Sequence, residues 1–171
     1  GVEATFGFRP EPDKSPFSYA THGAVVAVDP QLGSVEILDY VISEDCGTIV
    51  NPMIVDGQII GGTLQGVGTA LLEESTFDAE GQPLSSTFAD YIMPGSTNLP
   101  VIRLDHIVTP SPLTEFGVKG LGEGGAIPPP SAITNAVNDA IKSYNVEVTE
   151  TPITPRRLLV KLNIADSGNQ I

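Results

Sequence analysis

The sequence predicts an α+β fold in which hairpins and a mixed sheet pack with three helices. Residues 24–28 and 35–42 are rich in β-branched side chains and are separated by a turn signal, which indicates a β-hairpin. Helical patterns begin near residues 52, 131 and 156 and do not alternate regularly with strands. This arrangement favours α+β over a doubly wound parallel sheet. The 171 residues, 40% of them hydrophobic and 17% charged, are enough for one globular domain with its own core.

The N-terminal region reads as an arm followed by the hairpin. Residues 1–21 are expected to form an extended arm, with at most a short edge strand, because three prolines fall between Phe8 and Pro16. The main domain is expected over residues 22–164. Between the hairpin strands, Asp29-Pro-Gln-Leu-Gly33 carries the residues that a tight turn requires. The first residue is Gly and not Met, so we expect a chain cut or processed from a longer one, or a trimmed start.

A long glycine-rich helix is expected from Pro52 to Glu73 or Glu74. Asn51 as N-cap and Pro52 at the first helical position mark its start. Each interior glycine costs about 0.5–1 kcal/mol relative to alanine, so the glycines need a reason. Close packing against another backbone is one explanation, and close approach of a bulky cofactor is the other. Gln65 lies inside this cluster with an amide that both donates and accepts hydrogen bonds. The glycines concerned are Gly57, Gly61, Gly62, Gly66 and Gly68.

The second half of the chain predicts shorter elements. Strands are expected at residues 85–92, 101–108 and 146–149, and helices at 131–143 and 156–162. Ser131 is the candidate N-cap of the first of these helices, or Pro130 lies in its first turn. Residues 165–171 read as a polar, frayed tail.

A loop rich in glycine and proline, residues 117–130, holds the best candidate for catalysis. Glu123 has glycine on both sides, so no bulky side chain separates its carboxylate from an approaching ligand. If a ligand excludes water there, the pKa of the carboxylate rises and it becomes a competent general base. A flexible connector whose acid faces water is the alternative. The segment lacks the order of residues in a phosphate-binding P-loop, and its G-x-G-x-x-G match has no strong strand leading into it.

Composition excludes several classes of function. The net charge of −13 argues against a nucleic-acid partner, which requires a basic face. No apolar run reaches the roughly 18 residues of a membrane span, and no signal-peptide pattern is present. The single Cys46 excludes an internal disulfide and a multi-cysteine metal cluster in this chain. Cys46 could act as a nucleophile with His22 or His106 as its base, but a buried structural cysteine and packed histidines are the simpler interpretation.

Four segments, in order and approximate spacing, together resemble molybdenum hydroxylase large subunits. This is the family of xanthine dehydrogenase, aldehyde oxidoreductase and aerobic carbon monoxide dehydrogenase, and the resemblance covers nearly all of residues 20–162. The fold it implies is the C-terminal portion of a molybdenum-cofactor-binding subunit. The segments are Asp45-Cys-Gly-Thr-Ile-Val-Asn-Pro52, Gly57-Gln-Ile-Ile-Gly-Gly-Thr-Leu-Gln-Gly-Val-Gly68, Asp90-Tyr-Ile-Met-Pro94 and Gly117-Val-Lys-Gly-Leu-Gly-Glu-Gly-Gly125.

The resemblance implies roles for particular residues. Glu123 matches the family's catalytic glutamate, a general base that removes a proton from the hydroxyl group on the metal. Gln65 matches a glutamine close to the pterin, and Gly122 and Gly124 would let the loop backbone approach the metal centre. Cofactor contacts are also expected from residues on the helix and on the loop, namely Gly62, Gly66 and Lys119. No protein metal ligand is expected, because the family holds molybdenum through the sulfurs of its pterin.

The resemblance also implies partners and a reaction. The expected enzyme oxidises an aldehyde or an N-heterocycle with water as the oxygen source, in the cytoplasm. The residues Asp45-Cys-Gly and Met93-Pro94 look more like bacterial members, which implies the cytosine dinucleotide form of molybdopterin. The remaining part of the large subunit, an iron–sulfur subunit with [2Fe–2S] clusters and possibly an FAD subunit are the expected partners. A non-catalytic structural or assembly subunit of the same fold is the alternative.

Overall fold

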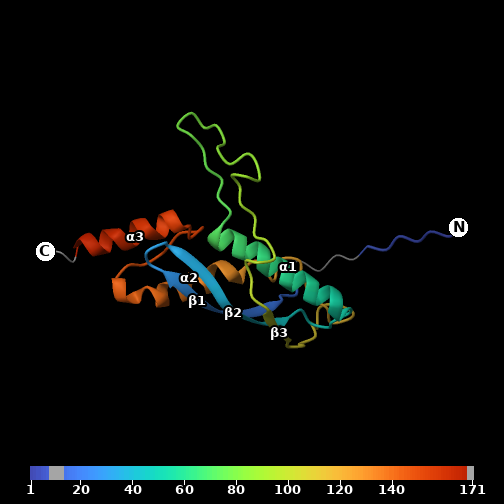
Figure 1. Ribbon diagram of the computed structural model, residues 1–171. Coiled ribbons are helices and arrows are strands. Elements are labelled where there is room, and N and C mark those ends of the chain that lie inside the picture. Colours follow the sequence, from blue (N-terminus) through green and yellow to red (C-terminus); the bar gives the residue numbers. More distant parts are fainter. Residues whose placement is uncertain (8–13, 169–171) are drawn as a thin grey trace.

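The fold class is α+β, as the sequence predicts. The computed structural model describes residues 1–7 and 14–168. Within these residues, three strands form one mixed sheet in the order β1-β2-β3, and three α-helices complete an α+β fold (Figure 1).

The predicted hairpin is confirmed and is longer than its sequence signal. β1 (Tyr19–Asp29) pairs antiparallel with β2 (Ser34–Asp45), with one register shift between Val25 and Val26. At the turn, the Asp29 carboxylate accepts hydrogen bonds from the backbone N–H groups of Gln31 and Leu32, at 2.8 and 3.0 Å. Gly33 completes the turn at a φ of +69°, a conformation that favours glycine.

β3 is confirmed, whereas the strand predicted at residues 85–92 is wrong. β3 (Ile102–His106) pairs in parallel with β2. Residues 72–101 form a long loop that projects from the end of α1 (Figure 1). No strand lies beside residues 85–92 within the described chain, so their β-branched and aromatic residues have no ladder to join. The Tyr91 hydroxyl instead donates to Glu73 at 2.5 Å and ties the loop to its base.

The glycine-rich helix α1 (Pro52–Leu71) begins where the sequence predicts. Its N-cap is Asn51, whose side chain accepts from the Ile54 N–H group at 3.4 Å. It ends at Leu71 and not at Glu73 or Glu74. The N–H groups of Leu72 and Glu73 both bond to the Gly68 carbonyl oxygen, at 2.9 and 2.8 Å, and this shared acceptor closes the last turn.

α2 (Pro128–Ala140) starts three residues before the predicted Ser131. Ser131 is therefore not the N-cap; Ile127 is, without a side-chain cap bond, while Pro130 lies in the first turn as the alternative prediction had it. Prolines are tolerated in a first turn, because the N–H groups there have no helical partner. A short 3₁₀ turn, η1 (Lys142–Tyr144), follows, and α2 packs against β1 and α1.

The short strand predicted at residues 146–149 is also wrong. Asn138 replaces a partner strand there, since its side chain accepts from the Val148 N–H group at 2.8 Å and donates to the Val148 carbonyl at 3.0 Å. The last helix, α3 (Pro155–Gly168), is seven residues longer than predicted and includes part of the expected polar tail. The rest of that tail, residues 169–171, lies outside the described residues.

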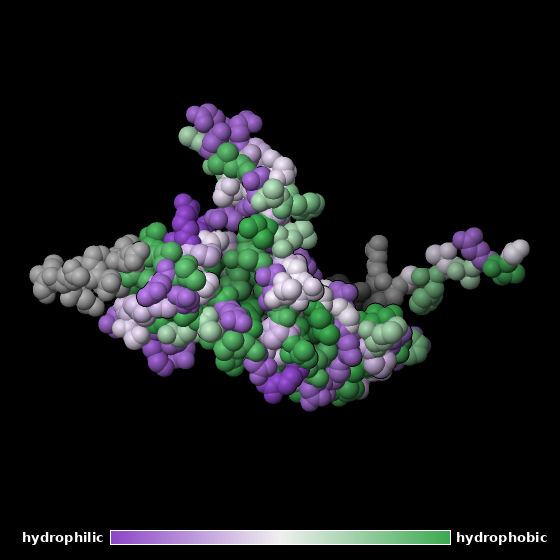
Figure 2. Space-filling view, viewed as in Figure 1, coloured by the Kyte–Doolittle hydropathy of each residue, from purple (hydrophilic) through white to green (hydrophobic). Residues whose placement is uncertain are grey.

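The hydrophobic core lies where α1, α2 and α3 meet the sheet. Tyr40, Ile59, Ile133 and Leu158 are each at most 1% exposed and come from four different elements. Many large apolar side chains nevertheless remain on the surface, as the green areas of Figure 2 show. On α1, Met53 and Ile54 are 77% and 63% exposed. This helix therefore buries one face in the chain itself and leaves an apolar face uncovered.

Candidate functional site

The loop that carries Glu123 is held by backbone pairing to the segment after β2. Gly47 and Val118 form an isolated antiparallel bridge, and the Lys119 N–H group donates to the Cys46 carbonyl at 2.8 Å. A Cβ atom at Gly47, where φ is +71°, would lie 2.2 Å from the Gly117 carbonyl oxygen, so this close approach requires glycine. Two segments that are separate in the sequence thus form one structural unit.

A buried ion pair between two side chains also holds these segments together. The Lys119 ammonium group lies 3.1 Å from Asp45, and both side chains are less than a tenth exposed. The ammonium group also lies 4.7 Å from the centre of the Tyr19 ring. Burial alone would raise the pKa of Asp45, but hydrogen bonds from Thr109, Gly47 and Lys119 outweigh it and lower this pKa to about 2. Lys119 thus points into the protein and anchors the loop.

The glycines of α1 divide into two faces with different surroundings. A Cβ atom at Gly62 would lie 3.1 Å from Gly125, and one at Gly66 would lie 2.7 Å from the Ala126 carbonyl oxygen. These two glycines let the loop backbone pack directly on the helix. At Gly57 and Gly61, by contrast, a Cβ atom would have no neighbour within 4 Å. The packing explanation accounts for the first pair, and the second pair leaves bare backbone at the surface.

The open face of α1 continues onto the loop. The Gln58 side chain donates to the Gly122 carbonyl at 2.8 Å and joins the two segments. Glu123 follows at once, exposed, in a turn closed by bonds from Ala126 and Ile127 to its own carbonyl oxygen, at 3.0 and 3.3 Å. Gln65, also exposed, is seven residues after Gln58, which places it two helical turns or about 10 Å further along the same face. Gln58, Gly61 and Gln65 therefore lie on one exposed side of α1, and Glu123 adjoins Gln58 through Gly122.

The predicted site residues thus fall into two groups. Glu123, Gln65 and Gly122 lie on the open surface, whereas Lys119, Gly62 and Gly66 face into the chain and shape the loop. Gly124 is partly buried, and a Cβ atom there would lie 2.9 Å from a carboxyl oxygen of Glu44. Contact of any of these residues with a cofactor stays a prediction.

Two contributors to the site were not singled out from the sequence. Gln58 follows a glycine on a helix, and no pattern distinguishes it from any exposed glutamine. Glu44 lies two residues after the strand predicted at residues 35–42, where an acid ordinarily faces water, yet it is 1% exposed. Neither was detectable without knowing which segments meet in space.

The geometry does not favour Cys46 as a nucleophile. Cys46 is 5% exposed, and burial raises the pKa of its thiol, which reduces the thiolate needed for attack. His22 bonds to the Tyr40 hydroxyl at 3.0 Å, and burial lowers its pKa to about 4. His106 bonds to Asp56 at 2.8 Å. Both histidines have structural partners, which agrees with the packing interpretation of all three residues.

The site thus consists of an exposed acid on a glycine-rich turn, next to a helix face of bare backbone. The sequence model of the "Molybdopterin cofactor-binding domain" matches residues 2–100. The chain belongs to this family.

Known relatives are large subunits of molybdenum hydroxylases. The chain is 42% identical over 143 residues to the nicotine 6-hydroxylase large subunit of Paenarthrobacter nicotinovorans, covering 84% of this chain and 18% of that protein. It is 35% identical over 161 residues to a carbon monoxide dehydrogenase large chain of Hydrogenophaga pseudoflava, covering 92% of this chain and 19% of that one. The crystal structure of quinoline 2-oxidoreductase from Pseudomonas putida 86 superposes with a TM-score of 0.81 at 43% identity, over 83% of this chain and 18% of that chain. The chain thus spans about a fifth of the length of these relatives.

Two features are absent from the described residues. Across the part of the chain that the structure describes, no three histidine, cysteine, aspartate or glutamate side chains gather in a way that could hold a metal ion. Within the same residues, no helix is both long and apolar enough to cross a membrane.

Proposed function

We propose that this chain forms part of the molybdenum-containing catalytic subunit of a hydroxylase or dehydrogenase, with Glu123 as its general base. Family membership supports the cofactor class. The observation that carries the assignment of the base is that Glu123 is exposed and directly follows Gly122, whose carbonyl oxygen accepts a hydrogen bond from Gln58 on α1.

The residues of this surface fit one side of a molybdopterin. Gly57, Gly61 and Gly122 have free space where a side chain would be, so a bulky planar group can approach their backbone. The Gln65 amide is exposed and offers both a donor and an acceptor to a pterin edge. When bound, the cofactor supplies the electron-accepting metal and makes water acidic enough to serve as the oxygen source.

The chain's own residues then have separate tasks. Glu123 accepts the proton that water loses as it becomes a nucleophile, which is general-base catalysis. Gln65 orients the pterin by hydrogen bonds, and Gly122 and Gly124 keep the loop thin beside it. Lys119, Gly62 and Gly66 act through the shape of the loop, because their contacts lie inside the chain.

The names of the relatives favour a nitrogen heterocycle as substrate over an aldehyde. Nicotine and quinoline, which appear in two of these names, both contain a nitrogen ring. We further propose the cytosine dinucleotide form of the cofactor and a cytoplasmic enzyme. The remaining part of the large subunit, an iron–sulfur subunit and an FAD subunit would be its partners, and the uncovered apolar face of α1 supports a partner at that surface.

Replacing Glu123 by Gln in the complete enzyme tests the base. Glutamine keeps the shape and the hydrogen bonds but cannot accept the proton, so we expect turnover to fall by at least ~10²-fold. Molybdenum content should stay near that of the parent. Glu115→Gln, an exposed acid in the preceding part of the same loop region, is the matched control and should keep the parental rate. Turnover at the parental rate in Glu123→Gln would overturn the assignment and favour a non-catalytic structural or assembly role.

A further inference from the structure

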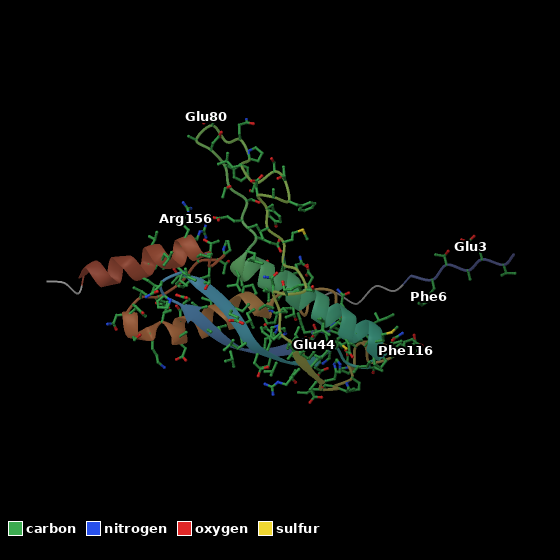
Figure 3. All side chains as sticks on the ribbon, viewed as in Figure 1. Glu3, Phe6, Glu44, Glu80, Phe116 and Arg156 are labelled. Carbon is green, nitrogen blue, oxygen red and sulfur yellow. The ribbon has the colours of Figure 1, made fainter. Side chains whose placement is uncertain are left out.

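Glu44 is a buried acid without a partner, directly behind the loop that carries Glu123. It lies near the end of β2, between α1 and the strands (Figure 3), and is 1% exposed. Neither of its carboxyl oxygens has a hydrogen-bond partner among the described residues. An isolated carboxylate is far more costly to bury than the neutral acid, so a carboxyl group in such a place keeps its proton.

The charged and titratable groups around Glu44 form no hydrogen bond with its carboxyl group among the described residues, although His106 favours the ionised form. His106 on β3 is its neighbour in the strand register, but its Nε2 atom is bonded to Asp56 on α1. Asp45, the next residue on β2, is paired with Lys119 of the loop. Burial is the largest cause that raises the pKa of Glu44; Asp45 raises it further, and His106 opposes the change.

One wall of this site is the backbone of the loop. A Cβ atom at Gly124 would lie 2.9 Å from a Glu44 carboxyl oxygen and 3.5 Å from the Leu121 side chain. The Glu44 carboxyl group thus packs directly against the backbone of Gly124. On the outer side of the loop, Gly120 and Gly122 have no such neighbours. Gly122 and Glu123 are exposed, so this part of the wall lies at the surface.

We propose that Glu44 is a positioning residue for Glu123. Its uncharged carboxyl group packs against the Gly122–Gly125 turn and keeps the turn in place, and loss of the proton displaces the turn. The turn is called seated when it packs against Gly62 and Glu44, and lifted when it has moved away from both. An ionised Glu44 needs water, and water reaches it in the lifted form. The effect of this movement of the turn on catalysis rests on the proposed function, whereas the movement itself does not.

The direction of the pH effect follows from proton binding. In the seated turn Glu44 is neutral, whereas in a lifted turn it titrates near its ordinary pKa of 4.5. Above pH 4.5 the lifted form gives up its proton and the seated form does not, so rising pH favours lifting. The opening equilibrium should rise about tenfold per pH unit until the raised pKa of the seated form is reached, and then level off.

Amide hydrogen exchange on the full chain, purified with whatever subunits accompany it, measures this opening. The reporters are the N–H groups of Ala126 and Ile127, which bond to the Glu123 carbonyl oxygen inside the turn. Exposed amides of residues 1–7 supply the intrinsic pH dependence for correction. We expect the corrected exchange of the reporters to rise about tenfold per pH unit in the parent and to be independent of pH in Glu44→Gln. Glu36→Gln, the same change at an exposed position of β2, should behave as the parent.

A second measurement does not depend on the variant's stability. Infrared spectra of the parent at neutral pH should contain the carbonyl band of a protonated carboxyl group, and this band should disappear at high pH together with the protection of the turn. No such band, or the same pH response in the parent and in Glu44→Gln, would overturn the proposal. Neither hydrogen exchange nor the infrared spectrum involves turnover, so failure of this proposal can be distinguished from failure of the Glu123→Gln test. A pH-dependent turn with an unaffected Glu123→Gln rate would reject the proposed function alone.

Discussion

At the scale of single residues, two charged side chains of one loop point in opposite directions. Lys119 turns inward and pairs with Asp45, whereas Glu123, four residues later, is exposed. The inward charge is fixed by several partners and the outward one is left free for a ligand. This division is what a catalytic loop requires, because a base acts only when its backbone is held in place.

The Asp45–Lys119 pair should contribute strongly to stability. Lys119→Met leaves a buried carboxylate without its cation, and we expect a loss of about 3–5 kcal/mol in the free energy of unfolding. Lys142→Met removes an exposed pair with Asp139 and should cost at most about 0.5 kcal/mol. Urea unfolding followed by circular dichroism compares the two. Equal small effects would show that the buried pair does not anchor the loop.

The same pair predicts an acid limit for stability. The pKa of Asp45 is lowered from 3.8 to about 2 in the folded chain. Its contribution is therefore complete above pH 3.8 and is lost as the pH falls towards 2. In Asp45→Asn this part of the pH dependence should be absent from unfolding curves measured between pH 5 and 2. A parental pH profile in that variant would contradict the lowered pKa.

Gln65 should affect cofactor retention and not the fold. Gln65→Ala removes an exposed amide that makes no side-chain hydrogen bond among the described residues, so the stability of the chain should change little. We expect lower molybdenum content in the purified enzyme, measured by elemental analysis. Thr69→Ala, one helical turn further on, is the control and should retain the metal. Full molybdenum occupancy in Gln65→Ala would remove the contact that we assign to it.

At the scale of elements, α1 combines two uses of glycine on one helix. One face admits the loop backbone, and the other leaves its own backbone open. The sequence predicted the helix and both explanations for its glycines, but it could not assign each glycine to a face. That assignment depends on the loop from Gly122 to Pro129, which lies about 60 residues away in the chain and contacts the helix only in the fold.

Alanine substitutions on the two faces should change stability in opposite directions. Gly66→Ala places a methyl group 2.7 Å from the Ala126 carbonyl oxygen and should destabilise the chain by about 1–3 kcal/mol. Gly61→Ala meets no neighbour and should stabilise it by about 0.5–1 kcal/mol through helix propensity. If a cofactor packs on the open face, Gly61→Ala should also lower molybdenum content. Denaturant unfolding of both variants and elemental analysis of Gly61→Ala measure these effects. Changes of the same sign in the free energy of unfolding of the two variants would contradict the two-face arrangement.

The elements that sequence patterns predicted well are those stabilised locally. The hairpin has its own turn, and α1 has its cap at Asn51. The wrong strands, residues 85–92 and 146–149, have extended-type sequences, but the fold gives them no strand to pair with. Asn138 satisfies the backbone of Val148, and no local pattern indicates that a side chain will replace a strand.

At the scale of the whole molecule, the chain has a buried hydrophobic core but leaves site residues and large apolar side chains exposed at its surface. Glu123 and Gln65 lie in the open, and apolar side chains such as Met53 and Ile54 are exposed on the same helix. The chain covers about a fifth of its relatives' length. Sequence motifs identified the family because their residues are local, whereas burial of Lys119 and Glu44 came from long-range contacts that motifs do not encode. We therefore expect other polypeptide to cover this face.

The central claim is that this chain works inside a molybdenum enzyme, and native mass spectrometry with elemental analysis tests it most directly. The protein should be purified from its source, without denaturation, and its mass and metal content measured together. We predict a complex larger than this chain alone, with molybdenum in it and iron on accompanying polypeptide. A lone, metal-free chain of about 17.9 kDa would contradict the account.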